Sequence, residues 1–204
     1  MGNYSSERAK IMQADNRTEA MKGANSPLHE KTLGVRRGFS GRAVTVDIID
    51  IELPDGRRAV RECVRHRGAV AVLARRPDGA FVFARQYRKC IEQAYIEIPA
   101  GCMEVGEAPD VAAERELREE SGYAVKSLLP LGSIYACPGY SEEQLHLFFA
   151  EVEAAPGATD FDPDENVETL LFDKETVERL ILDGTISDAK TLSAWLFARL
   201  RSCI

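Results

Sequence analysis

The pattern of apolar positions changes near residue 39. Residues 1 to about 30 are polar and show no clear apolar period, so we interpret them as a flexible arm, with a helix over Ser5–Met21 as the alternative. The segment Phe39–Leu53 is rich in Val and Ile with partial alternation, and it ends at the turn Pro54-Asp55-Gly56. Because Arg58–Arg65 has the pattern of a returning strand, we expect a β-hairpin before the main body of the chain.

Further strands follow in the main body. The continuous apolar run Gly68–Ala74 is typical of a strand buried on both faces. Pro77-Asp78-Gly79 predicts a hairpin turn after it. Five more segments have strand character: Ala80–Tyr87, Tyr95–Ala100, Leu128–Tyr135, Gln144–Val152 and Val167–Phe172.

Three helices are predicted among these strands. The first lies between Pro109, which suits a first helical position, and Gly122, which suits the position just past a helix end. Asp173 is the expected N-cap of a second helix, which Gly184 ends. Asp188 is the expected N-cap of a last helix, whose apolar face is formed by Leu192, Trp195, Leu196 and Leu200.

Strand hairpins combined with these helices indicate an α/β fold, in which a mixed sheet is covered by helices on its faces. We divide the chain into an N-terminal arm (1–32), a small N-terminal β subdomain (33–66) and a main domain (67–204). We expect Trp195 to be a core residue rather than part of a ligand site.

Composition narrows the class of protein. The formal net charge of the 204 residues is −7, which argues against a nucleic-acid backbone as the main partner. No apolar run approaches the length of a membrane span. The five cysteines are odd in number and form no C-x-x-C pair, which favours a reducing cytoplasm over a disulfide scaffold.

Candidate chemistry lies on the first helix. Glu116, Glu119 and Glu120 are at positions i, i+3 and i+4, so their carboxylates share one helix face. Repulsion between like charges makes such a face costly, whereas a hard divalent cation such as Mg²⁺ would make it a binding site. The alternative interpretation is a solvated acidic face paired with Arg115 and Arg118.

The residues around this face form a longer motif. From Gly101 to Tyr123 the chain follows the pattern G-x5-E-x7-R-E-U-x-E-E-x-G-U, where U is an apolar or aromatic residue. This pattern is the Nudix box, and the chain therefore resembles the Nudix hydrolases. The resemblance implies an α/β/α sandwich with a mixed central sheet. It also likens the N-terminal hairpin to the subdomain through which ADP-ribose-type members pair as dimers.

The resemblance implies roles for the box residues. Glu116 and Glu120 correspond to metal ligands, and Glu119 to a catalytic residue that ligates or bridges a second ion. The backbone carbonyl of Ala100 corresponds to a further ligand. The expected ion is Mg²⁺, with Mn²⁺ as the alternative. Glu107 and Arg115 correspond to residues that hold loop and helix together, with an outer-shell metal contact as the alternative for Glu107.

Residues outside the box resemble the ADP-ribose pyrophosphatase branch. Pro138 lies fifteen residues past the box and opens the run PGYSEE, in which Glu143 corresponds to the catalytic base and Glu142 is the alternative. Arg88 corresponds to an arginine that binds phosphate, and Glu97 to a glutamate near the ribose or the outer metal shell. The chain departs from this branch directly after Arg88, where Lys89-Cys90 replaces the proline-containing stretch that the resemblance implies.

The implied activity is Mg²⁺-dependent hydrolysis of ADP-ribose, or a related nucleoside diphosphate sugar, to AMP and ribose 5-phosphate. A GDP-mannose or UDP-sugar diphosphatase is the enzymatic alternative. The alternative from another class is a catalytically inactive Nudix-like module that senses nucleotides. We further expect a cytoplasmic homodimer with a small-molecule substrate and no membrane or nucleic-acid partner.

Overall fold

The computed structural model describes residues 26–161 and 166–204. The chain divides into two compact units, the first ending at Val64 and the second beginning at Arg65. Most of the expected arm, with the alternative helix Ser5–Met21, lies outside the described residues. No helix in the described ranges is long and apolar enough to cross a membrane.

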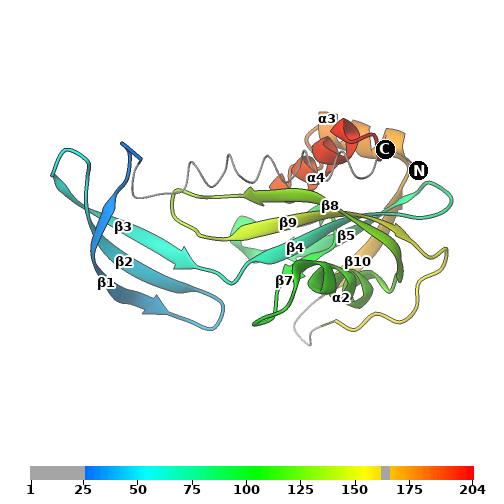
Figure 1. Cartoon of the computed structure of the whole chain (residues 1–204). Coiled ribbons are helices and arrows are strands. Elements are labelled where there is room, and N and C mark those ends of the chain that lie inside the picture. Colours follow the sequence, from blue (N-terminus) through cyan, green and yellow to red (C-terminus); the bar gives the residue numbers. More distant parts are fainter. Residues whose placement is uncertain (1–25, 162–165) are drawn as a thin grey trace. The chain divides into compact units, whose positions relative to one another are not determined.

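The first unit is an antiparallel sheet of three strands, not a hairpin of two (Figure 1). The strands are β1 (Lys31–Ser40), β2 (Thr45–Glu52) and β3 (Arg58–Arg65), with β2 in the middle. The prediction of one strand over 39–53 was wrong, because a turn closed by the Gly41 N–H and the Val44 carbonyl (2.8 Å) interrupts it. β1 went unpredicted because its side chains are almost all exposed and its polar sequence lacks an apolar period.

The second unit is built on a mixed sheet of seven strands. Strand order is β10-β5-β4-β9-β8, with β6 paired to β5 and β7 paired to β4. β4 and β9 run parallel to each other, and every other neighbouring pair in this order is antiparallel. The strands are β4 (Ala69–Arg75), β5 (Phe81–Arg88), β6 (Gln93–Glu97), β7 (Ala100–Cys102), β8 (Val125–Tyr135), β9 (Gln144–Val152) and β10 (Val167–Phe172).

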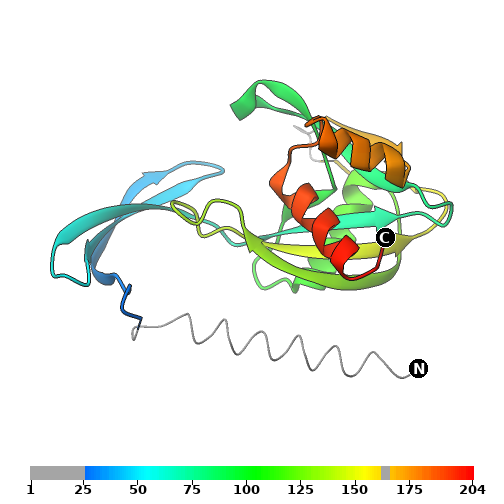
Figure 2. The same ribbon diagram turned by 90° about the horizontal axis from the view of Figure 1, so that it is seen from above.

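Helices cover both faces of this sheet, as predicted for an α/β/α sandwich (Figure 1). Alternate residues of β4 supply the two cores: Leu73 packs in a cluster with Trp195, and Val72 packs in a cluster with Leu117. The first cluster lies under α3 (Lys174–Leu182) and α4 (Ala189–Leu200), which lie on the same face of the sheet in Figure 2. The second lies under α2 (Pro109–Ser121). The prediction that β4 is buried on both faces is confirmed.

The helix ends agree with their predicted caps. Gly122 follows α2 with φ of +74°, and its N–H donates to the Arg118 carbonyl at 2.8 Å. Asp173 and Asp188 each accept a hydrogen bond from the backbone N–H three residues later. The predicted apolar face of α4 was wrong in part, since Leu196 and Leu200 are 54% and 74% exposed. Alanines and Trp195 fill the buried face instead.

An interruption of the strand before the motif places the start of the motif beside β4. The expected strand 95–100 is divided into β6 and β7 at Pro99, which has no N–H to donate. The Pro99 carbonyl accepts from Val72 N at 2.9 Å, so the chain passes from its partner β5 to its partner β4. Before this break, the short 3-10 helix η1 (Lys89–Ile91) connects β5 to β6. Ala100 and Gly101 thereby lie beside α2.

Candidate active site

The acidic face of α2 is aimed by the packing of its opposite face. Leu117 is fully buried in the core, which fixes the rotation of the helix. Glu120 Oε2 accepts a hydrogen bond from Ala100 N at 3.1 Å, and the Glu116 carboxyl group lies against Gly101. The expected metal ligands therefore lie between α2 and β7.

Gly101 is required by this close approach. A Cβ at this position would lie 2.1 Å from the Glu116 carboxyl carbon, far inside van der Waals contact. The absence of a side chain allows the carboxylate to rest against the backbone of β7. The first residue of the motif is therefore glycine because Glu116 occupies the space that a side chain would need.

Arg115 is the cation that balances the acidic face. Its Nε and one terminal nitrogen bind the two Glu107 oxygens at 2.9 Å each, and that terminal nitrogen also donates to the Cys102 carbonyl at 3.2 Å. The other terminal nitrogen binds Glu116 at 2.8 Å and Glu119 at 3.0 Å. These acceptors raise the pKa of Arg115 far above its usual range. One guanidinium therefore connects the loop before α2 to two carboxylates on it.

The Glu107 carboxylate accepts from three N–H groups. Besides Arg115, the backbone N–H of Glu104 donates to it at 2.8 Å. These bonds, that from Arg115 first, lower the pKa of Glu107 from 4.5 to about 2. A carboxylate with a depressed pKa stabilises the folded state above its unfolded pKa, and this contribution is lost as the pH falls through the folded pKa.

The carboxylates do not already form a metal cage. Within residues 26–161 and 166–204, no group of three or more His, Cys, Asp or Glu side chains has the geometry of a metal site. Arg115 binds both Glu116 and Glu119, which offsets the repulsion between these two carboxylates. Carboxylate oxygens and a backbone carbonyl nevertheless match the ligands that Mg²⁺ and Mn²⁺ prefer. The donor set thus fits a hard divalent ion.

The two glutamates of the 138–143 loop have different surroundings. Glu142 binds Arg65 at 2.7 Å and accepts from His66 N at 3.1 Å. Glu143 is 32% exposed, and its Oε1 lies 3.6 Å from His66 Nε2. Glu142 thus fastens the loop to the start of the second unit, whereas Glu143 has one longer contact.

Cys102 links the Glu143 loop to the acidic face. Burial raises the pKa of the Cys102 thiol, Arg67 opposes this rise, and the charges of Glu143 and Glu116 add to it. Both carboxylates therefore lie within electrostatic range of one thiol. The structure brings the expected base and one expected metal ligand to the same region.

Arg88 and Glu97 are partners of each other. Arg88 Nε donates to Glu97 Oε1 at 2.8 Å, and Lys190 pairs with the other carboxylate oxygen. Lys190 also pairs with Asp188 at 3.1 Å. Glu97 is only 3% exposed, whereas Arg88 keeps 42% of its side chain exposed. Sequence reasoning missed Lys190, because it lies 93 residues after Glu97 and no local pattern joins the two.

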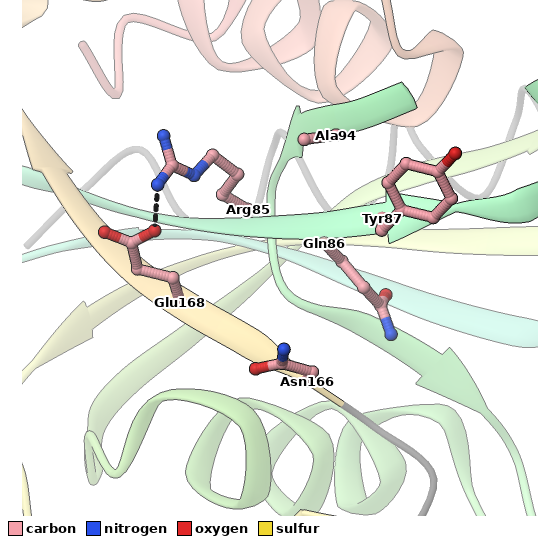
Figure 3. Close-up of a pocket in the computed structure, with 6 residues that line it drawn as sticks. All are labelled: Arg85, Gln86, Tyr87, Ala94, Asn166 and Glu168. Atoms are coloured by element: carbon pink, nitrogen blue, oxygen red, sulfur yellow. Dashed lines mark hydrogen bonds and ion pairs between the residues drawn. The ribbon is translucent and has the colours of Figure 1, made fainter. Parts of the chain in front are cut away.

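A hollow of about 340 Å³ lies elsewhere on this unit (Figure 3). An ion pair between Arg85 of β5 and Glu168 of β10 crosses it. The remaining lining residues are Gln86, Tyr87, Ala94 and Asn166. None of the expected site residues lines it, so the hollow does not coincide with the acidic face.

Comparison with known proteins agrees with this geometry. The model of the NUDIX domain matches residues 65–195. An ADP-ribose pyrophosphatase of Bacillus subtilis is 38% identical over 178 residues, which cover 87% of this chain and 96% of that protein. A methanol dehydrogenase activator of Bacillus methanolicus is 39% identical over 176 residues, covering 86% and 95%. The crystal structure of an ADP compounds hydrolase matches with a TM-score of 0.75 and 25% identity, covering 86% of this chain and 95% of that one.

The hydrogen bonds of Glu107 lead to a prediction about acid stability. We expect Glu107→Gln to be less stable than the wild type to urea at pH 7, because the depressed pKa of Glu107 stabilises the folded state there. This difference should shrink as the pH falls from 4.5 to about 2. Urea midpoints measured across that range test it. Glu114→Gln, at an exposed position of the following helix α2, is the control and should show no such trend. A Glu107→Gln deficit that is constant with pH would contradict the interpretation.

Proposed function

This chain belongs to the NUDIX family, and on that premise we propose that it hydrolyses the diphosphate bond of ADP-ribose to AMP and ribose 5-phosphate. The observation that carries the proposal is the position of the acidic face of α2 against β7. The Glu116 carboxyl group lies against Gly101, and Glu120 accepts a hydrogen bond from Ala100 N. The similarity to the B. subtilis ADP-ribose pyrophosphatase and to the ADP compounds hydrolase supports the substrate class.

We propose Glu116, Glu119, Glu120 and the Ala100 carbonyl as the ligands of a divalent cation. Mg²⁺ is the expected ion, and Mn²⁺ is the alternative with the same preference for oxygen. When bound, such an ion supplies positive charge against phosphoryl oxygens and lowers the pKa of coordinated water. Arg115 binds Glu116 and Glu119 as well as Glu107, and it would share the first two carboxylates with the ion.

The remaining residues bind substrate and move a proton. The exposed guanidinium of Arg88 binds a phosphate, and its pairing with buried Glu97 restricts its orientation. Glu143 accepts a proton from the attacking water. The water oxygen bonds to one phosphorus, the bridging oxygen leaves with the other phosphate, and the proton passes from Glu143 to solvent. Apart from the proton released to solvent, the atoms of water and ADP-ribose are all recovered in AMP and ribose 5-phosphate.

The ligand assignment predicts a selective effect at Glu120. We expect Glu120→Gln to lower kcat by roughly 100-fold or more, because it removes a charged ligand. The amide oxygen can still accept from Ala100 N, so the fold should remain. Mg²⁺ should raise the Tm of the wild type and raise that of the variant less. Glu114→Gln, on the same helix but exposed, should match the wild type in both measurements. Wild-type turnover by Glu120→Gln would refute the ligand role.

A chromatographic product assay tests the substrate. ADP-ribose, GDP-mannose, UDP-glucose, NADH and diadenosine diphosphate are supplied in parallel with Mg²⁺. We expect AMP to form fastest from ADP-ribose. Faster cleavage of GDP-mannose or UDP-glucose would retain the chemistry and overturn the proposed substrate.

A role without turnover is the second candidate. The B. methanolicus relative is as similar to this chain as the B. subtilis enzyme, and its name describes activation of another enzyme. Cleavage of none of the five compounds would favour a regulatory or nucleotide-sensing protein. The intact set of box carboxylates favours the enzyme.

We further propose that the protein is a cytoplasmic homodimer that pairs through the first unit. Apolar side chains of this three-stranded sheet are exposed at Leu33, Val35, Phe39, Val44 and Val60. Pairing with a second copy would remove such side chains from water. The five free thiols are consistent with a reducing compartment.

Light scattering after size exclusion tests the dimer. The expected mass is twice the 22.6 kDa of one chain. Phe39→Lys should shift the protein toward the monomer, because it places a charge in the proposed interface. Leu196→Lys is the matched control in the second unit, since its side chain is exposed to a similar extent, and it should leave the mass unchanged. A monomeric wild type would refute the dimer.

A further inference from the structure

We propose that His66 is a positioning residue that holds Glu143 in orientation for proton transfer. This inference rests on the proposed function, because it assigns a role toward the base of that reaction. His66 lies at the start of the second unit, directly before β4, and Glu143 lies 77 residues later (143 − 66) in the loop before β9. No local motif joins the two residues, and the contact is visible only in the folded chain.

A hydrogen bond to one nitrogen of the His66 ring determines that the other nitrogen carries the proton. That other nitrogen faces Glu143. His66 Nδ1 accepts from Gly68 N at 3.1 Å. The neutral ring therefore carries its proton on Nε2. Gly68 adopts φ of +93°, a left-handed conformation that glycine allows without strain, and this turn brings its N–H back to the ring. The backbone thus sets the tautomer of His66.

The protonated nitrogen faces the carboxylate. Nε2 lies 3.6 Å from Glu143 Oε1 and 3.6 Å from Cys102 Sγ. Catalytic hydrogen bonds are often long before substrate binds and shorten in the complex. Because the contact involves Oε1, the other carboxylate oxygen of Glu143 is the one assigned to the attacking water. The side chains of His66 and Glu143 are partly shielded from water, which strengthens their interaction.

The neighbouring contacts restrict both partners. Glu142 fastens the loop to Arg65 and to the backbone N–H of His66 itself. Within the loop, the Ser141 hydroxyl accepts from Glu143 N at 3.2 Å. The thiol of Cys102 contacts the His66 ring. Cys102 directly follows Gly101, the glycine against which the Glu116 carboxyl group lies. His66 therefore lies between the loop that carries the base and the strand beside the acidic face.

A double-mutant cycle tests this role. We expect His66→Leu to lower kcat by roughly 10-fold or more with KM changed less than about twofold, because the base is misaligned while substrate binding is retained. His66→Gln should recover most of the loss, since its amide nitrogen can donate in place of Nε2. In a Glu143→Gln background, His66→Leu should cause no further loss, because the carboxylate through which it acts is already gone.

Controls separate this role from folding and from the proposed function. His29→Leu, at a histidine of the first unit, should leave kcat unchanged. The rise of Tm with Mg²⁺ should be the same in His66→Leu as in the wild type, because the proposed ligands are untouched. An equal loss in both backgrounds, or a change in KM alone, would refute the positioning role while leaving the hydrolase intact. A wild type that cleaves none of the five compounds would refute the proposed function and this role together.

Discussion

The repulsion among three carboxylates on one turn and a half of helix is the constraint around which this domain is arranged. Arg115 offsets it by binding Glu116 and Glu119, and it uses the rest of its guanidinium for Glu107 and the Cys102 carbonyl. A single cation therefore stabilises the acidic face and orders the loop that precedes it. Hydrogen bonds to charged groups contribute about 1.5–3 kcal/mol each, so this residue outweighs an ordinary surface ion pair. Arg115 thus binds two of the carboxylates that we propose as metal ligands.

Local signals were sufficient for much of the fold. The run of β4 indicated burial on both faces, and capping residues located the ends of α2, α3 and α4. The predictions failed for those strands whose formation depends on distant parts of the chain rather than on the local sequence. β1 pairs through its backbone while its side chains are exposed, so no apolar period marked it. The break at Pro99 depends on which strand the chain pairs with next, and pairing across a sheet is not a local property.

The candidate site was also predictable where its residues are close in sequence and unpredictable where they are far apart. The residues of the box lie within 23 positions, so helical spacing alone places three carboxylates together, and the structure has them on one face of α2. Lys190 and His66 contact expected site residues from distant parts of the chain, and neither could be identified from spacing. Arg88 and Glu97 were both proposed to touch substrate, yet the structure pairs them with each other. Glu97 is buried between two cations, which suits a residue that orients Arg88.

The parts of the candidate site differ in how firmly they are held, and this difference bears on how it works. The acidic face is fixed by Leu117 in the core, and Arg88 is fixed by the buried carboxylate of Glu97, which Lys190 binds as well. Glu143 has one partly exposed contact, to His66, and the neighbouring Glu142 pairs with the partly exposed Arg65, a kind of ion pair that contributes about 0–1 kcal/mol. The proposed base therefore lies on the least firmly held part of the candidate site, whereas the acidic face and Arg88 rest on buried side chains. A base held by so few contacts needs a partner whose own position is fixed, and the hydrogen bond from Gly68 N to His66 Nδ1 fixes that partner.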